Sequence, residues 1–247
     1  MGENGQLVKL AGIRKYFGRV CALESVSLDV GYNEIVGLVG DNGAGKSTLI
    51  KILSGVFPPD AGEIRWQGKP ASFKSPADAI RAGIETIFQE TAVVDSMTVM
   101  RNIFMGRELV HRIGPLHWLD MKTMRRESMS ALELVDLRLR SPNAMVGELS
   151  GGQRQGVAIA RAMHFKTRLL ILDEPTNNLS VKESKRILDF IVELKKQGIS
   201  SIFITHNLNH VYPVADRIFV LSHGSEVGVF RKDQTSIEAL TELITLK

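Results

Sequence analysis

Several features that define other protein classes are scarce or missing in this sequence. Cys21 is the only cysteine in 247 residues, so neither a disulfide framework within the chain nor a zinc site of paired cysteines is expected. No apolar run approaches the ~18 residues of a membrane-spanning helix. The first residues lack the basic and apolar regions of a secretory signal. We therefore expect a cytoplasmic protein; if it works at a membrane, another subunit must hold it there.

The charge balance is also unremarkable. The net charge is +4, and no basic run is long enough to suggest a tail or a nucleic-acid surface, so we expect solvated lysines and arginines and no nucleic-acid partner. Apolar residues make up 44% and charged residues 23%, as in a globular protein. The length allows a full α/β core with one inserted subdomain.

Two patterns of apolar residues indicate two kinds of strand. Residues 26–30 alternate between apolar and polar, as a half-buried antiparallel strand does, and residues 64–66 look similar. Other runs are short and mostly apolar, as in strands covered by helices on both faces. These runs are residues 35–39, 83–88, 169–172, 202–205 and 217–221. Because helical patterns fall between them, we predict a mostly parallel sheet.

One helix has clear end signals. Ser180 and Glu183 form a capping box, with a serine at the N-cap and a glutamate three residues later. Apolar residues at helical spacing follow, and Gly198 is the expected stop.

Residues 90–160 have a different character and contain most of the methionines, with helical spacing over 120–137. We predict a helical subdomain here, inserted into an α/β core formed by residues 1–89 and 161–247. The methionines are either adaptable core residues or a surface that receives a partner's helix, with Met97 and Met100 as its candidates.

Residues 40–47 fit the phosphate-loop pattern G-x-x-x-x-G-K-[ST], between an apolar strand and a helix-like segment. The glycines let backbone N–H groups curl around phosphate oxygens, and the helix N-terminus adds a positive dipole end. Lys46 is expected to reach the β- and γ-phosphates, and the Ser47 hydroxyl to bind Mg²⁺. The predicted nucleotide contacts are Gly40, Asn42, Gly43, Ala44, Gly45, Lys46, Ser47 and Thr48.

Two acids, Asp173 and Glu174, end the apolar run 169–172. A carboxylate at the end of a buried strand can hold Mg²⁺, through water, which we predict for Asp173.

The sequence Leu-Ser-Gly-Gly-Gln at residues 149–153 lies between the phosphate loop and this acidic pair. With these three motifs in this order, the chain resembles the nucleotide-binding subunit of an ATP-binding cassette (ABC) transporter, from about Leu7 to Ile244. The resemblance implies a P-loop NTPase fold, with an N-terminal antiparallel β region and the inserted helical subdomain.

The resemblance also implies roles for single residues. Glu174 is the general base for the attacking water, Gln89 senses Mg²⁺ and that water, and His206 contacts the γ-phosphate. Phe17 is the aromatic that stacks on adenine, with Tyr16 as the neighbouring alternative. His210 follows His206 by four residues, but a metal pair is not expected without a third ligand.

In the family, two subunits pack head-to-tail around ATP. Ser150, Gly151, Gly152 and Gln153 of one subunit close over the γ-phosphate held by the other. The implied partner is therefore a second copy of this chain, or a similar one, in an ATP-dependent dimer.

Further details resemble bacterial importers of simple sugars, of the ribose or fructose type, in a single-cassette form. Residues 39–48, 98–106, 163–165 and 181–184 carry this likeness. It implies a membrane permease as partner, docked near residues 89–106, a solute-binding protein acting indirectly, and a place on the cytoplasmic face of the membrane. Ser180 stands where the family commonly has an aspartate, and Gly156 where an arginine is common. The alternative is a soluble ABC ATPase of an iron–sulfur assembly system.

Overall fold

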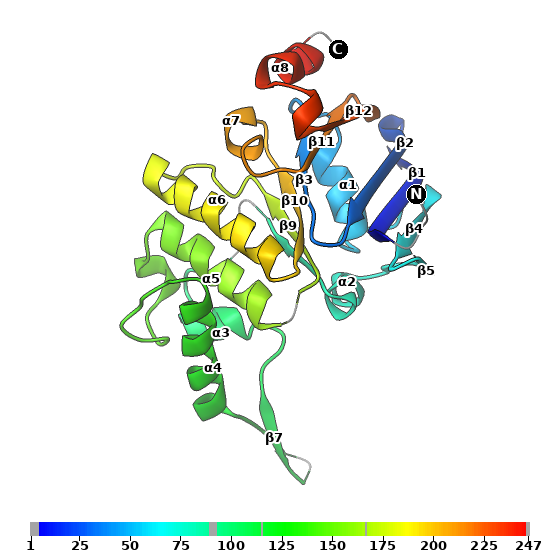
Figure 1. The fold of residues 1–247 in the computed structure, drawn as a ribbon. Coiled ribbons are helices and arrows are strands. Elements are labelled where there is room, and N and C mark those ends of the chain that lie inside the picture. Colours follow the sequence, from blue (N-terminus) through cyan, green and yellow to red (C-terminus); the bar gives the residue numbers. More distant parts are fainter. Residues whose placement is uncertain (1–4, 89–92, 115, 166, 246–247) are drawn as a thin grey trace.

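The computed structural model describes residues 5–88, 93–114, 116–165 and 167–245. Its centre is a six-stranded sheet in the order β12-β11-β3-β10-β9-β6, in which all pairs are parallel except the edge pair β11–β12 (Figure 1). These strands are β3 (Ile35–Val39), β6 (Ile84–Ile87), β9 (Leu169–Asp173), β10 (Ser200–Ile204), β11 (Arg217–Ser222) and β12 (Ser225–Arg231). The mostly parallel sheet is confirmed, and each of the five apolar runs overlaps one of its strands.

A second, antiparallel sheet has the order β2-β1-β4-β5. It is formed by β1 (Gln6–Phe17), β2 (Val20–Gly31), β4 (Ala61–Trp66) and β5 (Lys69–Ala71). The alternating segments predicted at residues 26–30 and 64–66 lie in β2 and β4. The sequence did not reveal β1, because register shifts, one of them between Leu10 and Ile13, break its alternation of apolar and polar residues.

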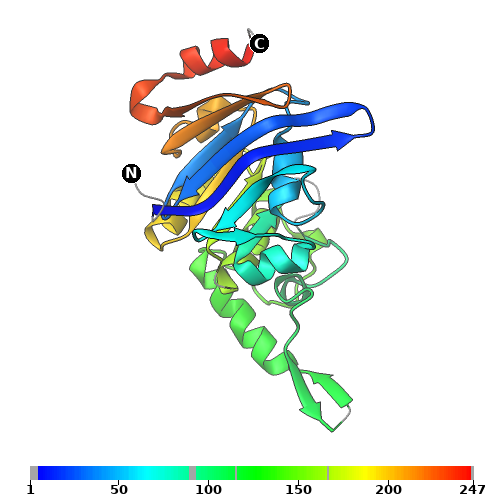
Figure 2. The ribbon, with the colours of Figure 1, turned by 90° about the vertical axis from the view of Figure 1, so that its right-hand side faces the viewer.

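Helices cover both faces of the large sheet. On one face of the large sheet, helix α1 (Lys46–Leu53) and the small sheet pack around one apolar core. On the opposite face, four helices supply the apolar residues of a second core (Figure 2). They are α5 (Gly151–His164), α6 (Val181–Lys196), α7 (Leu208–Val211) and α8 (Ile237–Thr245). Helix α2 (Pro76–Ala82) precedes β6. Burial on both faces explains why β3, β9 and β10 read as continuous apolar runs.

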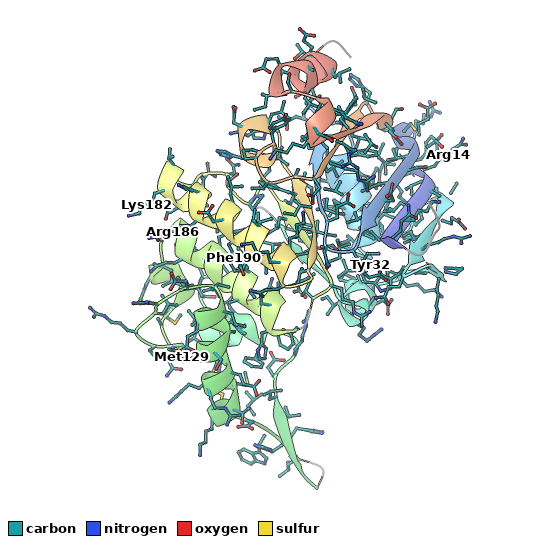
Figure 3. The ribbon with its side chains drawn as sticks, viewed as in Figure 1. Arg14, Tyr32, Met129, Lys182, Arg186 and Phe190 are labelled. Atoms are coloured by element: carbon teal, nitrogen blue, oxygen red, sulfur yellow. The ribbon has the colours of Figure 1, made fainter. Side chains whose placement is uncertain are left out.

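The predicted ends of α6 are confirmed. Ser180 is the N-cap, and its side chain and that of Glu183 form the capping box. The helix ends at Lys196, and Gly198 has a φ of 88°, a left-handed conformation that glycine adopts without strain. Lys182 and Arg186 lie on the solvent side of this helix (Figure 3).

A helical arm projects from this core and contains α3 (Val99–Ile103), α4 (Met121–Leu134), the 3₁₀ turn Val146–Glu148 and most of α5, packed around a third apolar cluster. The arm also carries an unexpected hairpin, β7 (Val110–Ile113) and β8 (Leu116–Leu119). A further 3₁₀ turn, Lys232–Gln234, precedes α8. No helix in the described part of the chain has both the length and the apolar character that a bilayer span requires.

The methionines of the arm divide into two groups. Met100 and Met124 are buried in its apolar cluster, which confirms the core interpretation for these two residues. The prediction that Met100 contacts a partner helix is therefore wrong, because its side chain is only 2% exposed. Met105 is 38% exposed and remains available at the surface.

These two environments give a matched test of the arm's core. We expect Met100→Ala to lower the free energy of unfolding by about 2–5 kcal/mol, because it leaves a cavity in the cluster. Met105→Ala should change it by less than about 0.5 kcal/mol. Urea denaturation followed by circular dichroism measures both, and equal effects of the two variants would contradict this packing.

Candidate functional site

The phosphate loop connects β3 to α1, and glycine is required at two of its positions. Gly40 has a φ of 153°, and a Cβ there would lie 2.1 Å from the carbonyl oxygen of Leu221. Gly45 has a φ of 104°, and its Cβ would lie 2.8 Å from the carbonyl oxygen of Ala22. Between them, Gly43 has nothing within 4 Å of a Cβ position, so no side chain or backbone packs against the loop at that point.

Lys46 is the first residue of α1, and its side chain folds back over the loop. Its Nζ donates hydrogen bonds to the carbonyl oxygens of Gly40, at 2.8 Å, and Asp41, at 2.9 Å. Burial lowers the pKa of Lys46, while the carboxylates of Glu174 and Asp173 act in the opposite direction. A cation at the N-terminus of a helix, beside open backbone, forms a site for a phosphate group.

Asp173 ends β9 and lies beside the same lysine. Desolvation, followed by repulsion from Glu174, raises the pKa of Asp173, and Lys46 opposes the rise. Ser47 is exposed in the first turn of α1. In the described residues no group of three or more His, Cys, Asp or Glu side chains could hold a metal ion. A hydroxyl and one carboxylate fit Mg²⁺, which keeps water ligands and takes further oxygens from a bound phosphate.

The side chain of Glu174 is fixed by the neighbouring strand end. Its oxygens accept hydrogen bonds from Thr205 Oγ1, at 2.8 Å, and from the His206 backbone N–H, at 3.0 Å. The Nδ1 of His206 lies 2.6 Å from Oε1 of the same carboxylate. Strands β9 and β10 are parallel neighbours, so their carboxyl ends bring residues 174 and 206 together. This carboxylate is therefore held at the mouth of the phosphate loop, where it can orient a water molecule.

The direct pairing of Glu174 with His206, and the part played by Thr205, were not predicted, because strand order is not visible in the sequence. His210 binds Thr176, with Nδ1 and Oγ1 2.9 Å apart, as expected of a structural histidine. Gln89, predicted to sense Mg²⁺, lies outside the described residues.

The predicted adenine platform lies at the end of β1. Phe17 and Tyr16 are both exposed, and the Phe17 ring contacts the edge of Phe57 at a centroid distance of 5.3 Å. The β1–β2 hairpin reaches the phosphate loop where Gly45 approaches Ala22. Phe17 therefore lies on the sheet that borders the loop, and its role in stacking remains a prediction.

The Leu-Ser-Gly-Gly-Gln segment forms the N-terminus of α5. Ser150 is the N-cap and forms a capping box with Gln153. The Oε1 of Glu183 on α6 accepts hydrogen bonds from Ser150 Oγ and from the Gly152 N–H, both at 3.3 Å. A carboxylate thus already lies against this helix N-terminus, which marks it as a second place that attracts anions.

These five residues and the phosphate loop remain separate within one chain. In the described part of the protein no hydrogen bond or ion pair joins residues 149–153 to residues 40–48. The two helix N-termini, of α1 and of α5, are therefore not joined by direct polar contacts between these residues.

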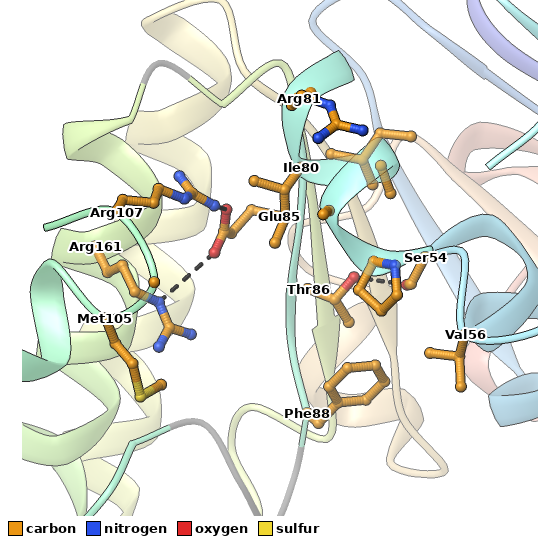
Figure 4. Close-up of a pocket in the computed structure, with 15 residues that line it drawn as sticks. Ser54, Val56, Ile80, Arg81, Glu85, Thr86, Phe88, Met105, Arg107 and Arg161 are labelled. Atoms are coloured by element: carbon orange, nitrogen blue, oxygen red, sulfur yellow. Dashed lines mark hydrogen bonds and ion pairs between the residues drawn. The ribbon is translucent and has the colours of Figure 1, made fainter. Parts of the chain in front are cut away.

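A groove of about 600 Å³ lies between α2, β6 and the arm, away from the phosphate loop (Figure 4). The buried Glu85 lies at its base, 2.5 Å from an Arg107 nitrogen and 3.6 Å from Arg161 Nε. Apolar side chains, among them Ile80 and Met105, line the rest. Two guanidinium groups share one carboxylate here, which leaves the groove with an excess of positive charge.

A phosphate loop between a buried strand and a helix, with acids at the end of another strand of the same parallel sheet, defines the class of P-loop NTPases. Residues 23–177 match the ABC transporter family. The chain belongs to this family and is one of its ATP-binding subunits, an ATPase.

Relatives extend the likeness over almost the whole chain. The xylose/arabinose import ATP-binding protein of Sulfolobus acidocaldarius is 44% identical, over 97% of this chain and 94% of the relative. The fructose import ATP-binding protein of Rhizobium meliloti is 43% identical, over 93% and 90%. A ribose import ATP-binding protein of Burkholderia thailandensis is 41% identical, but this chain spans only 46% of that longer protein.

Solved structures agree with the fold. A nucleotide-free ATP-binding cassette from an ABC transporter matches with a TM-score of 0.83 and 28% identity, over 97% of this chain and 95% of that one. A dimeric bacterial ABC transporter cassette matches with a TM-score of 0.76 and 25% identity, over 91% and 98%. The predicted P-loop NTPase fold and the family are therefore confirmed.

The position of Glu174 leads to a test of its chemistry. We expect Glu174→Gln to lower ATP turnover by about 10²–10⁴-fold, because an amide cannot accept the proton of the attacking water. ATP binding should persist, since the substitution leaves the loop and Lys46 unchanged. Phosphate release and binding of a fluorescent ATP analogue measure the two properties. Glu193→Gln, on the exposed side of α6, is the matched control, and near-normal turnover in Glu174→Gln would overturn the assignment.

Proposed function

We propose that this chain hydrolyses ATP to power the import of a small solute, most simply a monosaccharide, through a separate membrane permease. The observation that carries the proposal is the constellation of Lys46, Asp173 and Glu174 at the phosphate loop. The identity of the cargo rests on the xylose/arabinose, fructose and ribose importers among the relatives. These relatives give no support to an iron–sulfur assembly role.

Within this proposal, the loop residues and Lys46 bind the phosphates, and Phe17 stacks on the adenine. Mg²⁺, held by Ser47 and Asp173, would neutralise charge on the phosphate oxygens. Glu174 accepts the proton of the attacking water. His206, which already holds Glu174 by two contacts, keeps that carboxylate in place and reaches toward the terminal phosphate.

We propose further that two copies complete each site. The N-terminus of α5, with Ser150, Gly151, Gly152 and Gln153, would close over the γ-phosphate bound to the loop of the other copy. Support comes from the lack of direct polar contacts between these two segments in the described part of one chain and from the dimeric cassette among the similar structures.

The groove between α2 and the arm is the proposed contact for the permease. It is hollow, largely apolar and distant from the nucleotide loop, as a dock for a helix of another subunit should be. Residues 90–160 would then act as one subdomain that carries this contact, and the subunit would sit on the cytoplasmic face of the membrane. A solute-binding protein would act through the permease only.

Affinity purification from detergent-solubilised membranes tests the importer assignment. We expect a stoichiometric polytopic permease to co-purify with the chain. Ile80→Ala combined with Met105→Ala should lower its recovery about tenfold, because truncation of buried apolar anchors weakens interfaces. Leu134→Ala, an exposed site on α4 outside the groove, is the matched control and should leave recovery unchanged.

Two other results would count against this proposal. Recovery with soluble partners alone would move the chain to the class of assembly ATPases. Equal recovery of the permease with the groove variant and with the control would mean that Ile80 and Met105 do not contact the permease.

A further inference from the structure

The β7–β8 hairpin has no structural role in the cores described above. It extends from the arm away from the sheets (Figures 1 and 2), and none of its described residues belongs to an apolar cluster. Even so, it carries large apolar side chains in water, with Leu116 58% and Trp118 61% exposed. A lone two-stranded hairpin is only marginally stable, and exposed apolar patches mark interaction sites.

The apolar side chains lie on both faces of the hairpin. Trp118 pairs with His111, and Leu119 pairs with Val110. Directly paired residues share a face and successive residues alternate, so Trp118 and Leu119 point to opposite sides. A protein surface covers one face of such a hairpin, whereas the interfacial layer of a membrane surrounds both. Tryptophan, like tyrosine, is enriched at membrane–water interfaces.

Basic side chains follow the base of the hairpin in the chain. Helix α4 begins at Met121, directly after β8, and Lys122, Arg125 and Arg126 are exposed on its first turns. They border a shallow hollow with Met121 and Met129. In the described residues neither Lys122 nor Arg125 has an acidic partner.

The acids nearby are already engaged. Asp120 accepts a hydrogen bond from the Thr123 N–H at 2.9 Å and lies 2.9 Å from His111 Nε2. Glu127 lies 3.3 Å from His164 and 3.9 Å from Arg126. The hairpin therefore presents apolar side chains along its length, with basic side chains beside its base, and this combination complements a surface of anionic headgroups over an acyl layer.

We propose that the β7–β8 hairpin is an interfacial anchor for an anionic phospholipid surface. Leu116, Trp118 and Leu119 enter the headgroup layer, while Lys122 and the two arginines bind lipid phosphates. This contact is separate from the permease groove and from ATP hydrolysis, and it needs neither.

The two tryptophans make the proposal directly measurable. Trp66 is 9% exposed inside the core, so Trp118 is the reporter of a change in solvent exposure. The full chain, without permease, is titrated with vesicles of phosphatidylglycerol and phosphatidylcholine, and with phosphatidylcholine alone. We expect a blue shift of Trp118 emission and quenching by brominated lipid with the anionic vesicles only.

Matched variants separate the two parts of the anchor. Lys122→Glu with Arg126→Glu should weaken vesicle binding at least about tenfold, because each basic residue contributes to attraction by anionic lipid. Lys182→Glu with Arg186→Glu makes the same charge change at the same spacing on α6, distant from the hairpin (Figure 3), and should have little effect. Leu116→Ser with Leu119→Ser should abolish the blue shift, while ATP binding confirms that each variant is folded.

Three outcomes would overturn the proposal. The first is the absence of a shift with anionic vesicles. The second is an equal loss of binding in the α6 control, which would mean unspecific attraction by net charge. The third is a shift that requires permease in the vesicles, which would assign the hairpin to a protein partner.

Discussion

The uncapped N-terminus of α1 is the feature on which the rest of the site depends. The first N–H groups of any helix lack partners within the helix. Helices α2 to α6 satisfy them with side-chain caps, whereas α1 begins after Gly45 with no side-chain cap. Its free donors and the positive end of its dipole can be satisfied by a phosphate, and Lys46 adds a full charge at the same point.

The parallel sheet turns this single anion site into a reaction centre. Strand β10 lies between β3 and β9, and all three are parallel, so the phosphate loop, the acidic pair and His206 all emerge at one edge. Burial makes their charges strongly dependent on one another. Desolvation lowers the pKa of Lys46 and raises that of Asp173, and each group favours the charged form of the other.

The second anion-attracting terminus has a different construction. At the N-terminus of α5, backbone N–H groups donate hydrogen bonds to the side chains of Ser150 and Glu183, so the Leu-Ser-Gly-Gly-Gln segment is linked to the start of α6. Hydrogen bonds from Ser180, and then from Gly152 and Ser150, lower the pKa of Glu183 below its ordinary value. Glu183 therefore lies at the surface that, in the proposed dimer, would meet a partner's phosphate.

Local signals account for what the sequence predicted. The phosphate loop, the caps of α6 and the apolar runs of the parallel strands depend on residues close together in the chain, and the structure agrees with each. The contact between Glu183 and Ser150, and that between Thr205 and Glu174, join segments about 30 residues apart, and only the packing of helices and the strand order bring them together. The β7–β8 hairpin was missed because its sequence does not alternate between apolar and polar residues, and none of its residues with described burial is buried.

Complementation between two inactive variants tests the central claim, that one catalytic site is made from two chains. Lys46→Ala inactivates the phosphate loop of one variant, and Ser150→Arg blocks the Leu-Ser-Gly-Gly-Gln segment of the other. Random mixing of the two yields half mixed dimers, each with one intact site, so a two-fold arrangement predicts recovery of about a quarter of the normal ATP turnover. A mixture as inactive as either variant alone would contradict the account.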